Sequence, residues 1–189
     1  MQAVYKQGGK ELEGWVELFT ESARERFLTS GAAYLPAHIQ SSCGPLKSGD
    51  AVISPAFGSI NADFLCHAVG VPFYDLSKFK KILDDGGEEA ARATHDLQEQ
   101  AGLQLKLIKT IFKEAAVRGV TSIAIPAISG GKRGFPSPLA AAITHSVAAT
   151  EVLASRGTLE VHVVSWGAEN HRDAFECARE EVARKLVPC

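Results

Sequence analysis

Cysteine is scarce and scattered in this chain of 189 residues, where it occurs at Cys43, Cys66, Cys177 and Cys189. No Cys-x-x-Cys pair is present, so the spacing of a structural zinc site is missing, and we expect neither a metal nor another cofactor. Widely spaced thiols of this kind fit a reducing, intracellular location, cytoplasmic or nuclear. Cys66 falls in an apolar run, and we expect it to be a small buried core residue.

Long apolar runs and an excess of basic charge are also missing. Without an apolar stretch of about 18 residues or a hydrophobic N-terminal signal core, we expect neither a membrane span nor secretion. A net charge of −2 argues against general binding to nucleic-acid backbones. An apolar content of 46% and a charged content of 22% are ordinary for a globular protein, and the length predicts a single domain over 1–189.

The segment 120–136, VTSIAIPAISGGKRGFP, carries the strongest functional signal. Its β-branched run up to Ile125 is typical of a buried strand, and Pro126 cannot donate to strand pairing. A glycine-rich turn over 129–134 follows, and then a long helical pattern begins. Backbone N–H groups in such a turn, together with a helix start, form an anion cradle, so the segment predicts a phosphorylated ligand. By spacing alone, a tight connection that binds nothing stays an equal alternative.

The glycines do not have the spacing of a P-loop or of a dinucleotide-binding fingerprint. Instead, SIAIPAISGGKRGFP at 122–136 resembles the second phosphate loop of macro domains, which are ADP-ribose-binding modules. GPLKSGDAVIS at 44–54 and FLCHAVG at 64–70 resemble the central pair of strands in the same family. The resemblance covers residues 44–186 with a gap near 72–100, and its wording is closest to the multi-macro, antiviral class of poly(ADP-ribose) polymerases.

An α/β fold is expected on two grounds. Strands alternate with helices, and the strands after residue 110 are continuously apolar, which predicts a sheet covered on both faces. The macro resemblance implies a three-layer α/β/α sandwich with a mixed central sheet, lacking its first strands. The polar segment 76–100 is interpreted as a solvated loop that runs into a helix, with a lid as the alternative. The expected strands are 51–54, 64–69, 120–125 and 159–165, and the expected helices are 10–28, 93–118, 137–155 and 170–186. Gly119 is the expected C-cap of the helix before it, and Ser137 and Pro138 are the expected N-cap and first helical position of the next.

The resemblance also implies a set of site residues. It puts the ligand diphosphate on the backbone of the glycine loop, with Phe135 packed beneath. Trp166, just after the last strand, could stack on the adenine or form part of the core. Lys132 and Arg133 stand where many macro domains carry an apolar residue and an aromatic, and they could pair with the diphosphate or project into solvent. The expected binding residues are Ser129, Gly130, Gly131, Lys132, Arg133, Gly134, Phe135, Gly8, Gly9 and Trp166.

Several family features cannot be found, namely the aspartate that contacts adenine and the asparagine pair that contacts the distal ribose. Gly8 and Gly9 are interpreted as the remainder of the first phosphate loop, with residues 3–5 as the last fragment of a strand. The alternative is that another chain or a rearranged N-terminus completes the sheet, which would favour a homodimer. Glu11 and Glu13 lie near the position of a hydrolytic aspartate, but we interpret them as first-turn residues that complement a helix dipole.

The sequence is compatible with three functions. The first is a module that binds ADP-ribose or ADP-ribosylated protein. The second is a hydrolase that removes ADP-ribose from proteins or cleaves an ADP-ribose derivative, which the missing catalytic residues argue against. The third is a degenerate macro fold used for protein contact. His67, at the end of a strand, is expected to be a hydrogen-bonded structural residue.

Overall fold

The computed structural model describes residues 2–17, 46–73, 76–131, 133–165 and 169–186. The chain divides into two compact units, one of Met1–Lys47 with Ala51–His67 and the other of Ser48–Asp50 with Ala68–Cys189. The expected single domain stays a prediction. Among the described helices, none is both long enough and apolar enough to cross a lipid bilayer.

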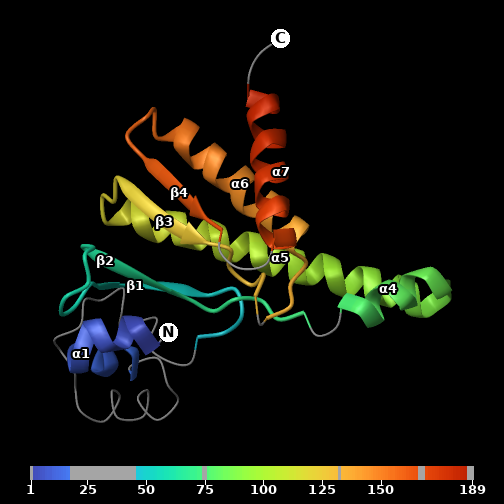
Figure 1. Ribbon diagram of the computed structural model, residues 1–189, viewed down its shortest axis with the longest axis horizontal. Coiled ribbons are helices and arrows are strands. Elements are labelled where there is room, and N and C mark those ends of the chain that lie inside the picture. The colour runs from blue at the N-terminus through green and yellow to red at the C-terminus, as the bar shows by residue number, and fades with distance from the viewer. Residues whose placement is uncertain (1, 18–45, 74–75, 132, 166–168, 187–189) are drawn as a thin grey trace. The chain divides into compact units, whose positions relative to one another are not determined.

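The first unit contains the helix α1 (Gln2–Glu17) and the hairpin of β1 (Ala51–Pro55) and β2 (Phe64–Ala68) (Figure 1). The turn of the hairpin is held to α1 by a 3.0 Å hydrogen bond from the N–H of Ser59 to the carbonyl of Gln7. The expected strand fragment at residues 3–5 is wrong, because these residues are helical. Two helical stretches meet within α1 at a kink at Gly9, where φ is 65° and ψ is −162°, so the second stretch begins near residue 10, as expected.

The second unit opens with α4 (Leu76–Asp85) and α5 (Gly87–Val117), so the solvated loop expected in this segment is wrong. The two helices are separated by Gly86, whose φ of 73° breaks the helical path. The start of α5 is polar on every side, which removes the apolar stripe that would have indicated a helix. Pairs such as Arg92 and Glu88, 3.3 Å apart and one turn along the helix, lie on its exposed surface.

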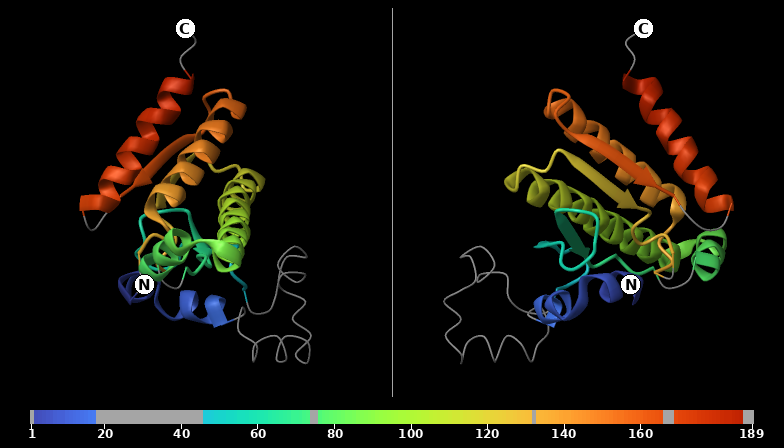
Figure 2. Two further views of the ribbon diagram at one scale, coloured as in Figure 1. Left: turned by 90° about the vertical axis from the view of Figure 1, so that its right-hand side faces the viewer. Right: turned by 60° about the vertical axis from the view of Figure 1, so that its left-hand side comes forward.

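The rest of the second unit is β3 (Ser122–Pro126), α6 (Ser137–Ala154), β4 (Glu160–Val164) and α7 (Glu169–Leu186). The strands β3 and β4 pair in parallel, with Ser122 opposite Glu160 and Pro126 opposite Val164. Helix α6 lies between α5 and α7 and also contacts β4 (Figure 2). Parallel pairing puts the carboxyl ends of both strands at the same sheet edge, where the glycine-rich turn begins.

Burial alternates along both of these strands. The apolar side chains Ile125 and Val163 face inward, whereas Ala124, His162 and Val164 are exposed. This differs from the cover on both faces that the continuous apolar runs predicted. Val163 packs against a cluster shared by α6 and α7, which is made of Ala141, Phe175 and Ala178. Helix packing on one face is therefore what holds this strand pair in the unit.

Helix α5 ends at Val117, just before Gly119, the glycine that the sequence predicts to terminate it. The N–H of Gly119 donates to the carbonyl of Ala116 (3.0 Å), and that of Val120 donates to the carbonyl of Ala115 (3.1 Å). This pair of bonds is a Schellman motif, which needs a left-handed residue at its centre, and Gly119 has a φ of 66°. The motif lets the chain leave α5 and enter β3 within a few residues.

Gly119→Ala should lower the free energy of unfolding by about 1 kcal/mol, because alanine resists the left-handed conformation. An added Cβ meets no atom within 4 Å at Gly119, so this backbone cost is isolated from any clash. Gly102→Ala is the matched control, because Gly102 lies inside α5 with equally open surroundings. The control should raise stability by about 0.5 to 1 kcal/mol. Equal effects of the two changes in chemical denaturation would contradict the prediction.

Candidate functional site

The glycine loop lies between β3 and α6 and is closed by its own backbone. The N–H of Phe135 donates to the carbonyl of Ser129 (3.1 Å), and the N–H of Gly134 donates to that of Gly131 (2.9 Å). At the start of the loop, the N–H of Gly130 donates to the carbonyl of Ala127 (3.3 Å). These bonds give the loop a defined shape rather than leaving it as an open connection.

Ser129 faces the interior of the unit, not solvent. Its side chain is buried, and its φ of 71° is unusual for a residue other than glycine. Its hydroxyl accepts a hydrogen bond from the N–H of Val71 (2.8 Å) and donates to Oε1 of Gln104 (2.8 Å). The side chain is therefore occupied, and a ligand at this position would meet the backbone instead.

Gly134 is required by its backbone conformation and by a close neighbour. Its φ is 69°, and an added Cβ would collide with the carbonyl oxygen of Phe73. Next to it, the carbonyl of Arg133 accepts a 2.7 Å hydrogen bond from the N–H of Phe73. The segment just after β2 thus contacts both ends of the loop, because Val71 bonds to Ser129 and Phe73 bonds to Arg133.

Gly131, Arg133 and Gly134 are the exposed residues among those of the loop that the structure describes, and Gly131 and Arg133 differ from Gly134 in their N–H groups. Within the described residues, the N–H groups of these two residues donate no hydrogen bond to another part of the chain. An added Cβ on Gly131 meets no atom within 4 Å, so the space above the backbone is open. Two available donors on a bare backbone are what an anion site needs. Lys132, between them, lies outside the described residues.

Helix α6 begins directly after the loop, and its N-cap is Pro136, not Ser137 as expected. No side chain caps this end, because proline has no side-chain acceptor. Pro138 occupies the first turn, as the sequence predicts. The helix therefore presents its partial positive charge beside the loop without a side-chain oxygen to offset it.

Phe135 packs beneath the loop, as expected. Its side chain is 1% exposed and forms a cluster with Val71 and Ala140. The ring of Phe73 approaches that of Phe135 edge-on, with centroids 6.4 Å apart and planes at 79°. This packing supports the loop from below and leaves its upper surface to Gly131 and Arg133.

Comparisons with known proteins identify the family. The family model described as Macro domain matches residues 29–144 of this chain, which is more than half of it. The chain is also 30% identical to O-acetyl-ADP-ribose deacetylase 2 of Pantoea vagans (strain C9-1), over 70% of this chain and 66% of that relative. Deacetylase 1 of the same organism is 30% identical over 68% of this chain and 63% of the relative.

The chain belongs to the macro domain family.

Solved structures confirm the expected α/β fold of this macro domain. It superposes on the Oceanobacillus iheyensis macrodomain with ADP at a TM-score of 0.63 and 20% identity, covering 98% of this chain and 76% of the other. The Trypanosoma brucei macrodomain in complex with ADP-ribose superposes with a TM-score of 0.52 at 15% identity, covering 92% of this chain and 59% of the other. The relatives found are deacetylases, so they do not support the expected closeness to the multi-macro polymerase class. The macro domain spans just under two thirds of the length of each deacetylase.

The remaining expected site residues lie elsewhere or are not described. Gly9 forms the non-helical kink between the two helical stretches of α1, and Gly8 precedes it; their part in binding stays a prediction. Glu11 and Glu13 follow the kink in the same helix and are exposed. Trp166 lies outside the described residues. Cys66 is exposed in β2, so the expectation that it belongs to the core is wrong.

Gln104 is the participant that sequence reasoning missed. It is fully buried on α5, where its Nε2 donates to the carbonyl of Ile128 (3.1 Å) and its Oε1 accepts from the hydroxyl of Ser129. A glutamine on the inward face, one position after Leu103, interrupts the apolar stripe of this helix, and that interruption was the available signal. Gln104 thereby links α5 directly to the start of the glycine loop.

His67 is structural, as expected. Its Nε2 lies 2.9 Å from the hydroxyl of Ser54, and its ring stacks on Trp15 with centroids 5.1 Å apart and planes at 27°. Burial lowers the pKa of His67 below its usual value of 6.5. The ring is therefore neutral at physiological pH, where its contacts are those of an uncharged imidazole.

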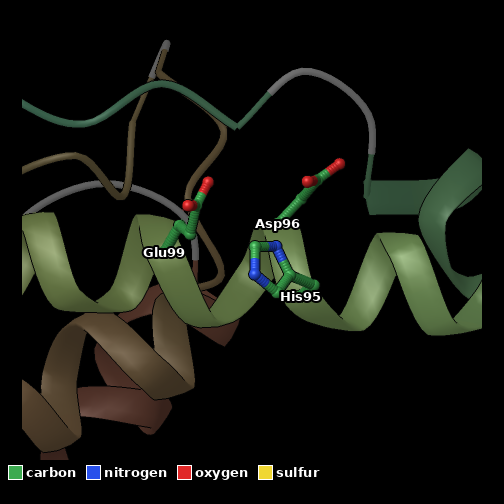
Figure 3. A group of neighbouring side chains, drawn as sticks. All are labelled: His95, Asp96 and Glu99. Atoms are coloured by element: carbon green, nitrogen blue, oxygen red, sulfur yellow. The ribbon is translucent and has the colours of Figure 1, made fainter.

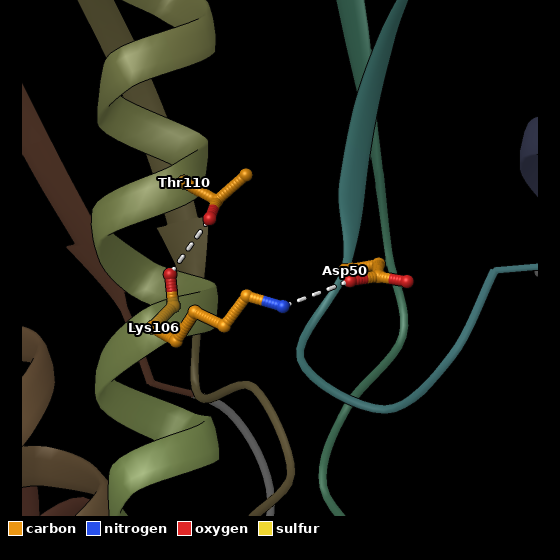
Figure 4. A network of polar contacts seen from close by, with 3 residues as sticks. All are labelled: Asp50, Lys106 and Thr110. Carbon is orange, nitrogen blue, oxygen red and sulfur yellow. Dashed lines mark hydrogen bonds and ion pairs between the residues drawn. The ribbon is translucent and has the colours of Figure 1, made fainter. Parts of the chain in front are cut away.

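Two further clusters of polar side chains include residues of α5. His95, Asp96 and Glu99 bring one ligand atom each within 4.8 Å of one another, but all three are exposed on a single stretch of helix (Figure 3). Lys106 reaches Asp50 at 3.2 Å, and its carbonyl accepts a 2.8 Å hydrogen bond from Thr110 (Figure 4). The first group lacks a buried ligand that would fix a metal, and the second holds the segment before β1 against α5.

Stability should fall in acid, because the unfolded chain protonates His67 at a pH where the folded unit keeps it neutral. Its contribution is complete above pH 6.5 and is lost as the pH falls through the lower pKa of the folded state. His67→Phe keeps a ring against Trp15 and cannot titrate, so the melting temperature should depend less on pH between about 7 and 5. Some dependence should remain, since burial, and then the charge of Arg179, lower the pKa of His145 too. An unchanged slope in His67→Phe would contradict this role of His67.

Proposed function

We propose that this macro domain binds ADP-ribose, free or attached to protein, and that the diphosphate rests on the backbone of the loop 129–134. The observation that carries the proposal is the pair of available N–H donors on Gly131 and Arg133, next to an α6 start that no side chain caps. Backbone donors and a helix N-terminus together favour a multiply charged phosphate over a neutral ligand. The ADP and ADP-ribose named with the similar solved structures support this choice of ligand.

Other residues would complete the site. The exposed guanidinium of Arg133 could approach the diphosphate, since it projects from the open part of the loop. Lys132 could do the same, and Trp166 would stack on the adenine. Gly8 and Gly9 stay predicted ligand-binding residues. A homodimer formed through an open strand edge stays a prediction.

A titration tests the proposal, with thermal unfolding followed in ADP-ribose and in AMP. ADP-ribose at ~100 times its dissociation constant should add about 2.7 kcal/mol to the stability of the protein. AMP should add less, because it has one phosphate where the loop can hold two. Gly131→Glu should abolish the shift, since the carboxylate fills the open space and repels phosphate, while the unliganded melting temperature stays near that of the parent.

Gly102→Glu is the control for this titration, because it adds the same charge at an equally open position on α5 and should keep the parental shift. Parental affinity in Gly131→Glu would show that the phosphate is not bound by this loop. The absence of any shift at millimolar ADP-ribose would favour a macro fold used for protein contact.

A second candidate function is hydrolysis of an ADP-ribose derivative. It is favoured by the name of the relatives, O-acetyl-ADP-ribose deacetylase, at 30% identity. The chain itself argues the other way. Glu11 and Glu13, the carboxylates nearest in sequence to the position of a hydrolytic aspartate, are exposed on α1, and an asparagine pair for the distal ribose is missing. We therefore propose that binding, not turnover, is the main activity.

Turnover should accordingly stay near background when the protein is incubated with O-acetyl-ADP-ribose or with a mono-ADP-ribosylated protein. The measurement is release of acetate or of ADP-ribose over time, with heat-inactivated protein as the control. Release well above background would overturn the prediction. Glu11→Gln and Glu13→Gln would then be compared with the parent to find the responsible carboxylate.

A further inference from the structure

Gln104 is a fully buried side chain of α5 with one hydrogen bond to the glycine loop, at Ser129, and one to the residue before it, Ile128. Both ends of its amide are used, since Nε2 donates to the carbonyl of Ile128 and Oε1 accepts from the hydroxyl of Ser129. A buried amide with both ends satisfied has one favourable orientation, because rotating it would place like groups against each other. The position of the loop relative to α5 is therefore specified at two consecutive residues.

The backbone of Ser129 needs such support. A φ of 71° is rarely adopted by a serine, so other interactions must stabilise this conformation. Three hydrogen bonds converge on Ser129, from the N–H of Val71, to the amide of Gln104 and from the N–H of Phe135. Gln104 is the only one of these partners that acts through a side chain, and so the only one that substitution can remove without changing the backbone.

The surroundings leave little room for another arrangement. An added Cβ on Gly70 would lie 2.8 Å from the hydroxyl oxygen of Ser129, so the chain passes this hydroxyl at close range. Three segments distant in sequence, at residues 70–71, 104 and 129, thus meet around one oxygen atom. Ser129 stands two residues before Gly131, whose N–H is an available donor on the exposed part of the loop. A change in the conformation of Ser129 would consequently redirect that donor.

We propose that Gln104 is a positioning residue for the anion site. It does not touch the ligand; it holds residues 128 and 129 in the conformation that directs the N–H groups of Gly131 and Arg133 outward. This inference rests on the proposed function for its ligand, and its effect on the loop can be measured without one. It predicts that affinity for ADP-ribose depends on a side chain buried below the loop.

A purely structural role gives a different result from a positioning role. If Gln104 only stabilised the core, its loss would lower the melting temperature, and the folded protein would bind with parental affinity. If it positions the loop, affinity falls even where the protein is fully folded. Gln104→Met removes both hydrogen bonds at similar length and volume, so it separates the two roles. Ile111→Val is the matched control, because it trims another buried residue of α5 without a bond to the loop.

The experiment measures ADP-ribose affinity by calorimetry well below the lowest melting temperature. Gln104→Met should bind about tenfold more weakly than the parent, which corresponds to about 1.4 kcal/mol, and Ile111→Val should bind as the parent does. Ser129→Ala should weaken binding to a similar degree. The losses in the double variant should be less than additive, because both changes break the shared hydrogen bond between Gln104 and Ser129. Parental affinity in Gln104→Met, or fully additive losses, would overturn the proposal.

Hydrogen exchange of the unliganded protein gives a second test that does not depend on the ligand. Amides of the loop that are hydrogen-bonded, at Gly130, Gly134 and Phe135, should exchange faster in Gln104→Met than in the parent, and those of α7 should not. The Ile111→Val control should leave the loop amides unchanged. If the parent fails to bind ADP-ribose, the proposed function fails, and exchange alone decides whether Gln104 positions the loop. Unchanged exchange at these amides in Gln104→Met would overturn the inference.

Discussion

The hydroxyl of Ser129 is the point on which the candidate site depends. It is a polar group buried in the second unit, and such a group must be hydrogen-bonded or it destabilises the fold. Satisfying it requires the N–H of Val71 on one side and the amide of Gln104 on the other. Because these partners come from different segments, the conformation of the loop depends on the packing of α5 and of the chain following β2. The candidate anion site thus depends on contacts across the second unit.

The remaining features of the loop follow from that constraint. Because Ser129 and Phe135 are both buried, the chain between them must reach the surface at Gly131 and re-enter the interior within a few residues. The return is made at Gly134, where a left-handed conformation and the nearby carbonyl of Phe73 exclude any side chain. Phe135 then enters the core, and α6 starts at Pro136 with its first turn uncapped by a side chain. The packing of Phe135 in the interior and the exposure of the loop backbone are therefore linked. Burial of this ring keeps the N–H groups of Gly131 and Arg133 at the surface.

Much of this could be predicted from the sequence. Strands β1 to β4 and helices α6 and α7 lie close to their expected positions, because short β-branched runs and apolar stripes are local signals. A C-cap at Gly119 was likewise expected from one glycine, and the structure forms it as a Schellman motif. The start of α5 was missed because it is polar on every side and so has no periodicity to detect. α4 was also missed, although Phe79, Ile82 and Leu83 follow helical spacing. Ser137 was expected to cap α6, but the tight return after Gly134 places Pro136 at that position.

The sequence by itself determined that a glycine-rich loop lies between a strand and a helix and that the chain resembles macro domains. Glycine, serine and proline have distinct local backbone preferences, so this pattern can be interpreted without knowledge of distant neighbours. Only the tertiary structure decided that Ser129 points inward, that Gln104 is its partner, and that Gly131 and Arg133 carry the available donors. These assignments depend on contacts between residues 25 and 58 positions apart, and no local pattern encodes which buried polar groups will satisfy one another.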